Sequence, residues 1–470
     1  MPSVVATPTP LVAPEFPVVT AVSTVLSSSG VISVTSNVIG TVYLVEESKP
    51  FFRISDLEPL STWWWMGAPI TKVGTNSISV DVQTKLNGVY RIFVVNSAGS
   101  ISRPATQMLT ISVADRAQPV RRPCTNQAAN LMCLVLDTNL NNEISATNAI
   151  ELPFDGLFDV TVNWGDAGAP ERYTTGPVRH VYATEGDYEV TIAGLADSFG
   201  DGEWEGADLL TSVAAFGDLG LTSLEFAFSG AANLTNVPDT LPAAVTSTRG
   251  MFQGAAAFNQ DISNWDVSNV SNMGQMFNIA WSFNQDISDW DVSSVTDMSL
   301  MFYEASAFNQ PLALWDVSSV TNMVSMFEEA SRFNRLLDSW DVSNVTNMHR
   351  MFHSAVDFNQ DISDWDVSSV TDMSLMFFDA DSFNQDISAW NVSNVTDMSL
   401  MFYHANSFNR PLALWDVSSV TNMVSMFEEA SRFNRLLDSW NVSNETNMCS
   451  MFDGTALSSP PSWYSCLVPT

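Results

Sequence analysis

A unit of 25 residues repeats without insertion through the C-terminal half of the chain, and this repeat limits the possible folds more than any other feature. The dipeptide Met-Phe recurs at this step from Met251 to Met451. A tryptophan recurs at the same step from Trp265 to Trp440. Because one such unit cannot bury its apolar face alone, the pattern predicts a solenoid of eight stacked units over residues 251–453.

The spacing of apolar residues inside one unit predicts two kinds of local structure. A short helix is predicted by the first group, whose i, i+1, i+4, i+7 spacing marks one helix face: Met251, Phe252, Ala255 and Phe258. An extended stretch is predicted by the second group: Ile262, Trp265, Val267 and Val270. A helix and a strand in each unit are typical of leucine-rich repeats, so we expect an LRR-like α/β solenoid.

Asparagine recurs directly after the second phenylalanine of every unit, as Asn259, Asn284 and Asn309 illustrate. A side chain at this point can hydrogen-bond the backbone groups of the turn and form a ladder between units. We therefore assign the asparagines, like the methionine and tryptophan columns, to structure and not to a ligand or cofactor site.

The N-terminal half reads as all-β. Residues 1–16 are Pro-rich and are expected to be a disordered tail. Six or more short alternating strands over 17–114 predict an immunoglobulin-like β-sandwich, and 115–128 is expected to be a linker. We expect a second β-sandwich over 129–196. The solenoid is expected to have an atypical N-terminal cap over 197–250 and a C-terminal cap over 454–470.

The second β region resembles the polycystic-kidney-disease (PKD) module, which has a Trp-x-Gly-Asp turn and a His-x-Tyr…Gly-x-Tyr-x-Val pattern. The matching residues are Trp164, Gly165, Asp166, His180, Tyr182, Gly186, Tyr188 and Val190. The resemblance implies a β-sandwich spacer of the kind found in extracellular proteins.

The repeat itself resembles a known family. FNQDISNWDVSNVSNM, residues 258–273, is similar to the 26-residue repeat of bacterial surface proteins of the BspA-like leucine-rich type. The resemblance extends over about 129–453. It implies an exported adhesin-like protein with no catalytic residues to carry over.

The charge of the chain argues against two classes of partner. With 52 acidic and 18 basic residues, the net charge is −34, whereas nucleic acids and anionic membranes need basic patches. No apolar run is long enough to insert into a membrane, and MPSVVATPTPLVAPEFPVV has no secretory signal pattern. Export with a signal that has been removed and presentation on a virion surface both remain open.

Four cysteines form two local pairs, Cys124 with Cys133 and Cys449 with Cys466. Pairs placed where a fold needs closing suggest disulfides and an oxidising compartment, although the sequence does not choose among the three connectivities. No cofactor is expected. Two acidic stretches, 137–143 and 197–208, are weak calcium candidates. His349 and His353 have i, i+4 spacing but no further ligand motif, so we expect them to face solvent.

Candidate binding residues are those that vary between the fixed positions of the repeat. They are Tyr303, Glu304, Phe378, Asp379, Tyr403 and His404 in the units, and Trp63, Trp64 and Trp65 in the N-terminal region. No catalytic motif occurs, so we predict a non-enzymatic extracellular adhesion or interaction protein that binds a protein or glycan on another surface. The alternative is a structural component of a virion or cell envelope that assembles with itself.

The repeats also contain an internal duplication, because residues 311–340 recur identically at 411–440. This identity implies that the number of units is free to vary.

Overall fold

The computed structural model describes residues 130–140, 148–200, 202, 204–444 and 446–466 in full, and the strands of the N-terminal part by their backbone. The chain divides into two compact units, Met1–Val120 and Arg121–Thr470, which are described separately here. Among the described residues no helix has the length and apolar character needed to cross a membrane.

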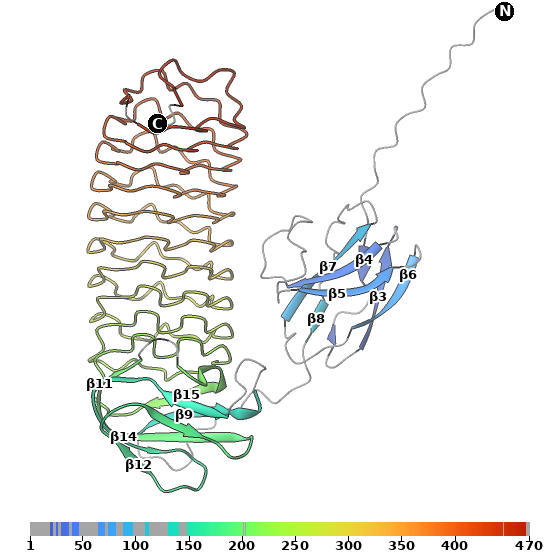
Figure 1. Cartoon of the computed structure of the whole chain (residues 1–470), viewed down its shortest axis with the longest axis vertical. Helices are drawn as coiled ribbons and strands as arrows, with labels where there is room; N and C mark the ends of the chain where they lie inside the picture. The colour runs from blue at the N-terminus through green and yellow to red at the C-terminus, as the bar shows by residue number, and fades with distance from the viewer. Residues whose placement is uncertain are drawn as a thin grey trace, which may run out of the picture. The chain divides into compact units, whose positions relative to one another are not determined.

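The first unit contains two sheets, with strand orders β1-β3-β6 and β2-β8-β7-β4-β5 (Figure 1). Neighbouring strands are antiparallel except β2 and β8, which are parallel. The strands are β1 (Val19–Ala21), β2 (Val25–Leu26), β3 (Gly30–Ser36), β4 (Gly40–Glu46), β5 (Trp64–Ile70), β6 (Gly74–Val80), β7 (Gly88–Asn96) and β8 (Leu109–Ile111).

The second unit begins with a five-stranded antiparallel sheet of order β12-β11-β14-β9-β15 and a two-stranded sheet of β10 and β13. Its strands are β9 (Met132–Asp137), β10 (Ala149–Leu152), β11 (Phe154–Asn163), β12 (Glu171–Tyr173), β13 (Val178–Val181), β14 (Asp187–Phe199) and β15 (Leu210–Phe216). Strand β9 is buried almost throughout, as expected for an apolar strand covered on both faces.

Strand β15 joins this sheet to the repeats. On one side it pairs with β9, and on the other the Val213 amide donates to Asn236, in the segment that precedes the repeats. A second series of parallel bridges starts at Ser198 of β14, runs through Ser223, Ser247 and Asn272 and continues along the repeats. The sheet therefore covers the N-terminal end of the stack, so the apolar core of the β region and that of the repeats are continuous.

The repeats form a stack of coils, one coil per 25 residues (Figure 1). We number the residues of a coil from the Met of Met-Phe, position 1, to position 25, and call residues 251–275 coil 1 and residues 426–450 coil 8. Within each coil the chain consists of successive turns, and a bridge of one residue at position 22 links it to its neighbours, as between Asp297 and Asn322.

The predicted fold class, with an LRR-like α/β solenoid, is wrong. The helical segments among the described residues are two short 3-10 turns, η2 (Thr138–Leu140) and η3 (Ala207–Leu209), and neither lies in the repeats. The Met-Phe segment is a pair of turns instead. The Met301 amide donates to Met298 three residues back, but the Phe302 amide donates to Met326 in the next coil.

Backbone conformation explains why the helix does not form. The residues at positions 25 and 4, such as Leu300 and Glu304, have φ of 57° and 52°, in the left-handed region. Such a residue interrupts right-handed helical hydrogen bonding, so the turn ends after one bond. The residues predicted for one helix face, Met251, Phe252, Ala255 and Phe258, are all fully buried. Residues at the two ends of a turn are thus three or four positions apart in the sequence, as residues on one face of a helix are.

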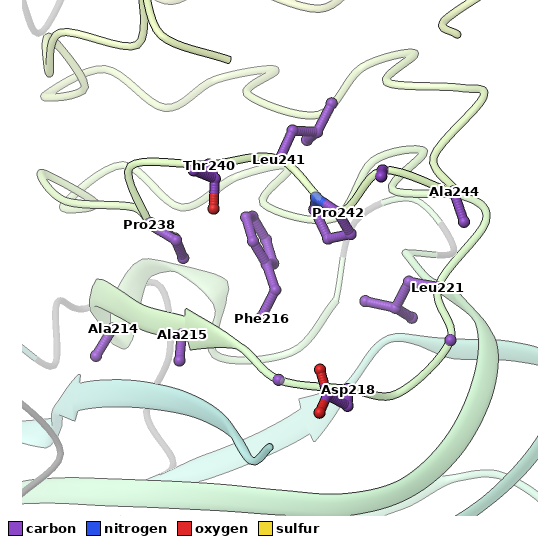
Figure 2. A pocket seen from close by; sticks show the side chains of 13 residues that line it. Ala214, Ala215, Phe216, Asp218, Leu221, Pro238, Thr240, Leu241, Pro242 and Ala244 are labelled. Atoms are coloured by element: carbon purple, nitrogen blue, oxygen red, sulfur yellow. The ribbon is translucent and has the colours of Figure 1, made fainter. Parts of the chain in front are cut away.

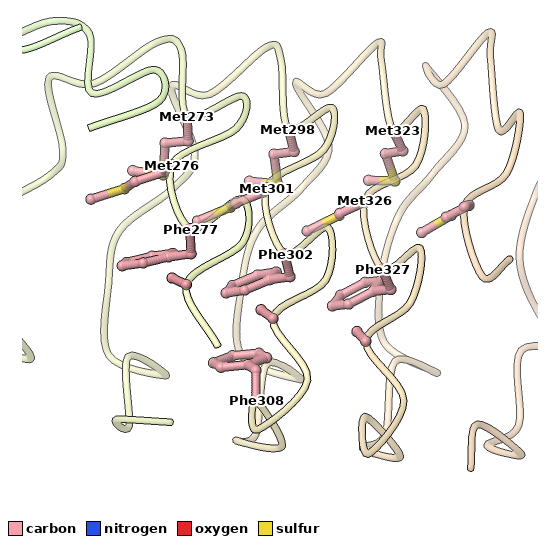
Figure 3. Close-up of a cluster of buried hydrophobic side chains, with 14 of the residues drawn as sticks. Met273, Met276, Phe277, Met298, Met301, Phe302, Phe308, Met323, Met326 and Phe327 are labelled. Atoms are coloured by element: carbon pink, nitrogen blue, oxygen red, sulfur yellow. The ribbon is translucent and has the colours of Figure 1, made fainter. Parts of the chain in front are cut away.

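Stacking of identical side chains fills the core. Met298, Met301 and Phe302 recur in the same orientation in adjacent coils (Figure 3). The rings of Phe302 and Phe327 are parallel within 7°, with centroids 5.6 Å apart. Each tryptophan indole donates to a carbonyl of the preceding coil, as Trp315 does to Ile287 at 3.0 Å. These contacts keep the coils in register because each depends on the same position in the next coil.

The asparagine ladder predicted from the sequence is confirmed. The side-chain oxygen of Asn259 accepts the backbone amide of Asn284 at 2.9 Å, and Asn284 does the same for Asn309. These asparagines are exposed or half-buried at the side of the stack, so the ladder ties neighbouring turns together at its surface.

The last coil is closed by the C-terminal segment. The ring of Trp463 stacks on Trp440 at 5.9 Å, and its indole donates to Leu437. The predicted disulfide between Cys449 and Cys466 is confirmed. Cys133 is also disulfide-bonded, whereas Cys124 lies outside the described residues.

Candidate functional site

The six candidate residues of the repeats lie on one ridge, formed by positions 3 and 4 of successive coils. From coil 3 to coil 7 the ridge consists of Tyr303, Glu304, Glu328, Glu329, His353, Ser354, Phe378, Asp379, Tyr403 and His404. Position 4 has a left-handed backbone, and its amide donates to position 3 of the next coil, as Asp379 does to Tyr403 at 2.8 Å. The backbone of the ridge is therefore held from coil to coil while its side chains vary.

Four of the candidates form one contiguous cluster. The rings of Phe378 and Tyr403 stack at 4.6 Å, and His353 stacks on the other face of Phe378 at the same distance. His404 packs on Tyr403 at 4.4 Å and its Nδ1 lies 3.1 Å from Asp379 Oδ1. Because the rings cover each other's faces, this part of the ridge presents ring edges and a carboxylate to a ligand.

Tyr303 and Glu304 lie in coil 3, three coils from Phe378, and are not part of that cluster. Partial burial raises the pKa of Tyr303 to about 12, with further contributions from Glu304 and Glu329. The phenol is therefore neutral at physiological pH. This end of the ridge combines a hydroxyl group with several carboxylates.

Sequence reasoning missed an ionic cluster in the middle of the ridge. Glu328 is only 3% exposed, and its Oε1 lies 3.0 Å from Arg350 Nη1 and 3.5 Å from His353 Nδ1. Burial, with smaller contributions from Arg350 and His349, lowers the pKa of His353 to about 4. The expectation that His353 faces solvent is wrong, because its side chain is 14% exposed.

The duplicated segments held the signal for this cluster. Glu428 has the same flanking sequence as Glu328, but further along the chain Ser450 and Asp453 stand where Arg350 and His353 would be. Glu428 is half-buried. A comparison of the residues that follow the two identical segments would have shown that Arg350 and His353 differ between them.

The other candidates lie elsewhere. Trp64 and Trp65 begin β5 and pair with Val45 and Leu44, and Trp63 is outside the described residues. The two calcium candidates are not open acidic loops where they are described. The first has Asp137 at the end of β9, bonded to Asn139, and the second begins inside β14. No group of three metal-ligating side chains occurs among the described residues.

A groove of about 560 Å³ lies where β15 meets the turn at 238–244 (Figure 2). The side chains that line it are mostly apolar, with Phe216 and Pro242 prominent, while backbone groups supply much of its polar surface. Asp218 and Thr240 are the polar side chains that line it. It therefore lacks the convergent polar groups typical of an orienting ligand site.

Comparison with known proteins concerns the same repeats. The family model described as "Mycoplasma protein of unknown function, DUF285" matches residues 222–338, 312–413 and 363–462. The matches overlap and together run from 222 to 462, slightly more than half of the chain. The chain belongs to the DUF285 family. No curated protein and no solved structure matches it. The DUF285 matches begin before coil 1 and include the whole ridge.

Proposed function

We propose that this DUF285 chain is a non-enzymatic extracellular interaction protein that binds a protein ligand through the ridge. The observation that carries the proposal is that each coil has fixed buried positions and variable positions between them. Positions 1, 2 and 5, such as Met376, Phe377 and Ala380, are fully buried. Positions 3 and 4 between them vary in charge and size on a backbone of fixed geometry. A repeated scaffold with variable outward residues is the usual arrangement of solenoid binding surfaces.

Two resemblances support an extracellular setting. The repeat is similar to that of BspA-like surface proteins. The β region carries the residues of a PKD-like motif, and these residues contact one another. Trp164 stacks on His180 at 4.9 Å, and the Tyr182 hydroxyl donates to the Trp164 carbonyl at 2.9 Å. The disulfide at the C-terminal cap supports an oxidising compartment.

The chemistry of the ridge favours a basic protein surface as the ligand. Glu304, Glu329 and Asp379 supply carboxylates, and the stacked rings supply apolar edges. A glycan is less well matched, because sugars pack against open ring faces and these faces are covered. Arginine is the expected partner residue, since its planar guanidinium bonds carboxylates and packs on aromatic groups.

The proposal can be tested with the full chain and two synthetic peptides of equal length, one rich in arginine and leucine and one rich in glutamate and leucine. The arginine peptide should bind, and the double variant Glu304→Gln with Asp379→Asn should bind it more weakly by about tenfold. The matched control removes the same charge away from the ridge, by Asp316→Asn with Asp366→Asn. Equal weakening by the control would show nonspecific attraction to an acidic chain and contradict the proposal.

A structural role in an envelope or virion lattice is the second candidate. It is favoured by a second edge of the stack, at positions 10–14, where exposed leucines and arginines recur every four coils. A lattice protein should form open-ended assemblies of many copies, whereas a binding protein should not. Sedimentation of the chain alone distinguishes the two roles.

A further inference from the structure

Along the edge formed by positions 10–14 of the coils, acidic residues alternate with apolar and basic residues at a regular interval. We call it the alternating edge. In coils 1, 2, 5 and 6 position 11 is an exposed aspartate: Asp261, Asp286, Asp361 and Asp386. In coils 3, 4, 7 and 8 position 11 is Pro311, Leu336, Pro411 and Leu436. Acidic and apolar pairs of coils thus alternate along the stack.

The apolar coils also carry uncompensated apolar and basic groups. Leu314, Leu336, Leu414 and Leu436 are 78%, 53%, 83% and 76% exposed, which is unusual for leucine in a folded protein. Position 10, glutamine in the other five coils, is arginine at Arg335, Arg410 and Arg435. Each arginine Nε donates to a carbonyl of the preceding coil. In the described part of the chain none of them forms a close salt bridge, and Arg410 interacts only at longer range with Asp386 of the preceding coil.

The edge is a straight and regular surface. Position 9 is tied to position 9 of the next coil by the asparagine ladder, and the indole at position 15 donates to the carbonyl at position 12 of the preceding coil. The residues between these two columns are therefore in register from coil to coil. At about 4.8 Å per coil the eight coils give an edge about 38 Å long.

We propose that this edge binds a second copy of the chain, antiparallel, about a two-fold axis between coils 4 and 5. This arrangement places coils 1, 2, 3 and 4 of one copy opposite coils 8, 7, 6 and 5 of the other. Arg335 then lies opposite the Asp361 turn of the partner copy, Arg410 opposite the Asp286 turn and Arg435 opposite the Asp261 turn. Every unpaired arginine meets an acidic coil and no arginine meets another.

Other two-fold arrangements do not have this complementarity. A two-fold axis parallel to the stack places each coil opposite its own copy, so arginines face arginines and aspartates face aspartates. Like charges at an interface disfavour association. A closed antiparallel dimer also uses one self-complementary surface, as most homodimers do. In this pairing Leu314 meets Ala389 of coil 6, whereas Leu336, Leu414 and Leu436 lie opposite aspartates, so the match rests on the arginines and not on apolar burial.

The size of the edge predicts a weak dimer. A seam one turn wide and of this length buries on the order of 1,000 Å² in total, at the lower end for specific interfaces. The net charge of −34 on each copy opposes association as well. The dimer should therefore appear only as concentration rises. It goes beyond the binding role of the ridge, which lies at positions 3 and 4 and leaves this edge free.

The test is sedimentation equilibrium of the full chain, with a charge exchange between facing coils. Arg410→Asp should weaken the dimer by tenfold or more, and so should Leu314→Asp with Leu414→Asp. Adding Asp286→Arg to Arg410→Asp should restore it, because coil 7 of one copy faces coil 2 of the other. All these positions are on the surface, and circular dichroism should show an unchanged fold.

A matched control separates contacts between copies from contacts within one chain. Asp386 is the neighbour of Arg410 in the same copy. Hydrogen bonds from Ser388 lower the pKa of Asp386 most, and Arg410 contributes to the lowering. Arg410→Asp with Asp386→Arg restores this internal pair but not the one across the interface, so it should not restore the dimer. A parent chain that is monomeric at all concentrations, or equal rescue by the two exchanges, would overturn the proposal.

Discussion

Oε1 of Glu328 lies 3.0 Å from Nη1 of Arg350, the last residue of the same coil, and the glutamate is 3% exposed. The identical segment around Glu428 has no such cation, because Ser450 stands in place of Arg350. A buried carboxylate is costly without a charged partner. The two identical segments therefore differ in how their glutamate is stabilised, because the residues that follow them in the sequence differ.

Arg350→Ala should destabilise the stack by about 2–3 kcal/mol, below the usual cost of breaking a buried pair because Arg350 itself is 41% exposed. Ser450→Ala, at the equivalent position beside Glu428, is the matched control and should change the stability by less than about 0.5 kcal/mol. Thermal melting followed by tryptophan fluorescence measures both. An equal effect of the two substitutions would show that Glu328 does not depend on Arg350.

The stability of the stack should fall as the pH is lowered from about 6.5 to about 4. His353 has its pKa lowered to about 4 in the fold, so in this window the unfolded chain binds a proton that the folded chain does not. The loss from this group is about 3 kcal/mol at most. His353→Gln should flatten the profile in this window. Urea titrations at a series of pH values check this, and an unchanged slope would contradict it.

Trp365→Ala should cost about 3–5 kcal/mol, because the ring is 3% exposed and stacks between Trp340 and Trp390. Its indole also donates to Leu337 at 2.9 Å, and that carbonyl would lose its partner. Leu314→Ala, which removes an exposed side chain, is the control and should have little effect. Thermal stability equal to that of the parent would contradict the role of Trp365 in the core.

Deletion of residues 326–425 should leave a folded, shorter stack. The excision removes four whole units and joins Ser325 to Met426, so every bond between coils finds the same position in the next coil. Deletion of 336–425 breaks the period and should prevent the stack from forming. Circular dichroism and thermal melting of both proteins decide. An unfolded in-phase deletion, or an out-of-phase one that folds equally well, would refute independent stacking.

Periodicity alone was enough to identify the buried side chains. Met251, Phe252, Ala255 and Phe258 are all in the core, and the Asn259 ladder forms as expected. The conformation between them was mispredicted as helix. An i, i+3 turn and a helix place apolar residues at similar spacings, so side-chain pattern does not distinguish them.

On the ridge, the sequence identified Phe378, Asp379, Tyr403 and His404 as variable positions that share a surface. It did not identify Glu328, Arg350 and His353, whose contacts join residues more than twenty positions apart in the sequence. Register between coils determines such contacts, and the register becomes known only when the coils are stacked.

The sequence by itself determined the period and the apolar residues that are buried, because both follow from which positions are apolar. The tertiary structure decided which amides bond within a turn and which bond to the next coil. The Phe302 amide, for example, donates to the Met326 carbonyl of the next coil. That carbonyl is within hydrogen-bond distance only when the neighbouring coil is in place. A backbone donor must be satisfied in either case, and the neighbour, not the local sequence, supplies the acceptor.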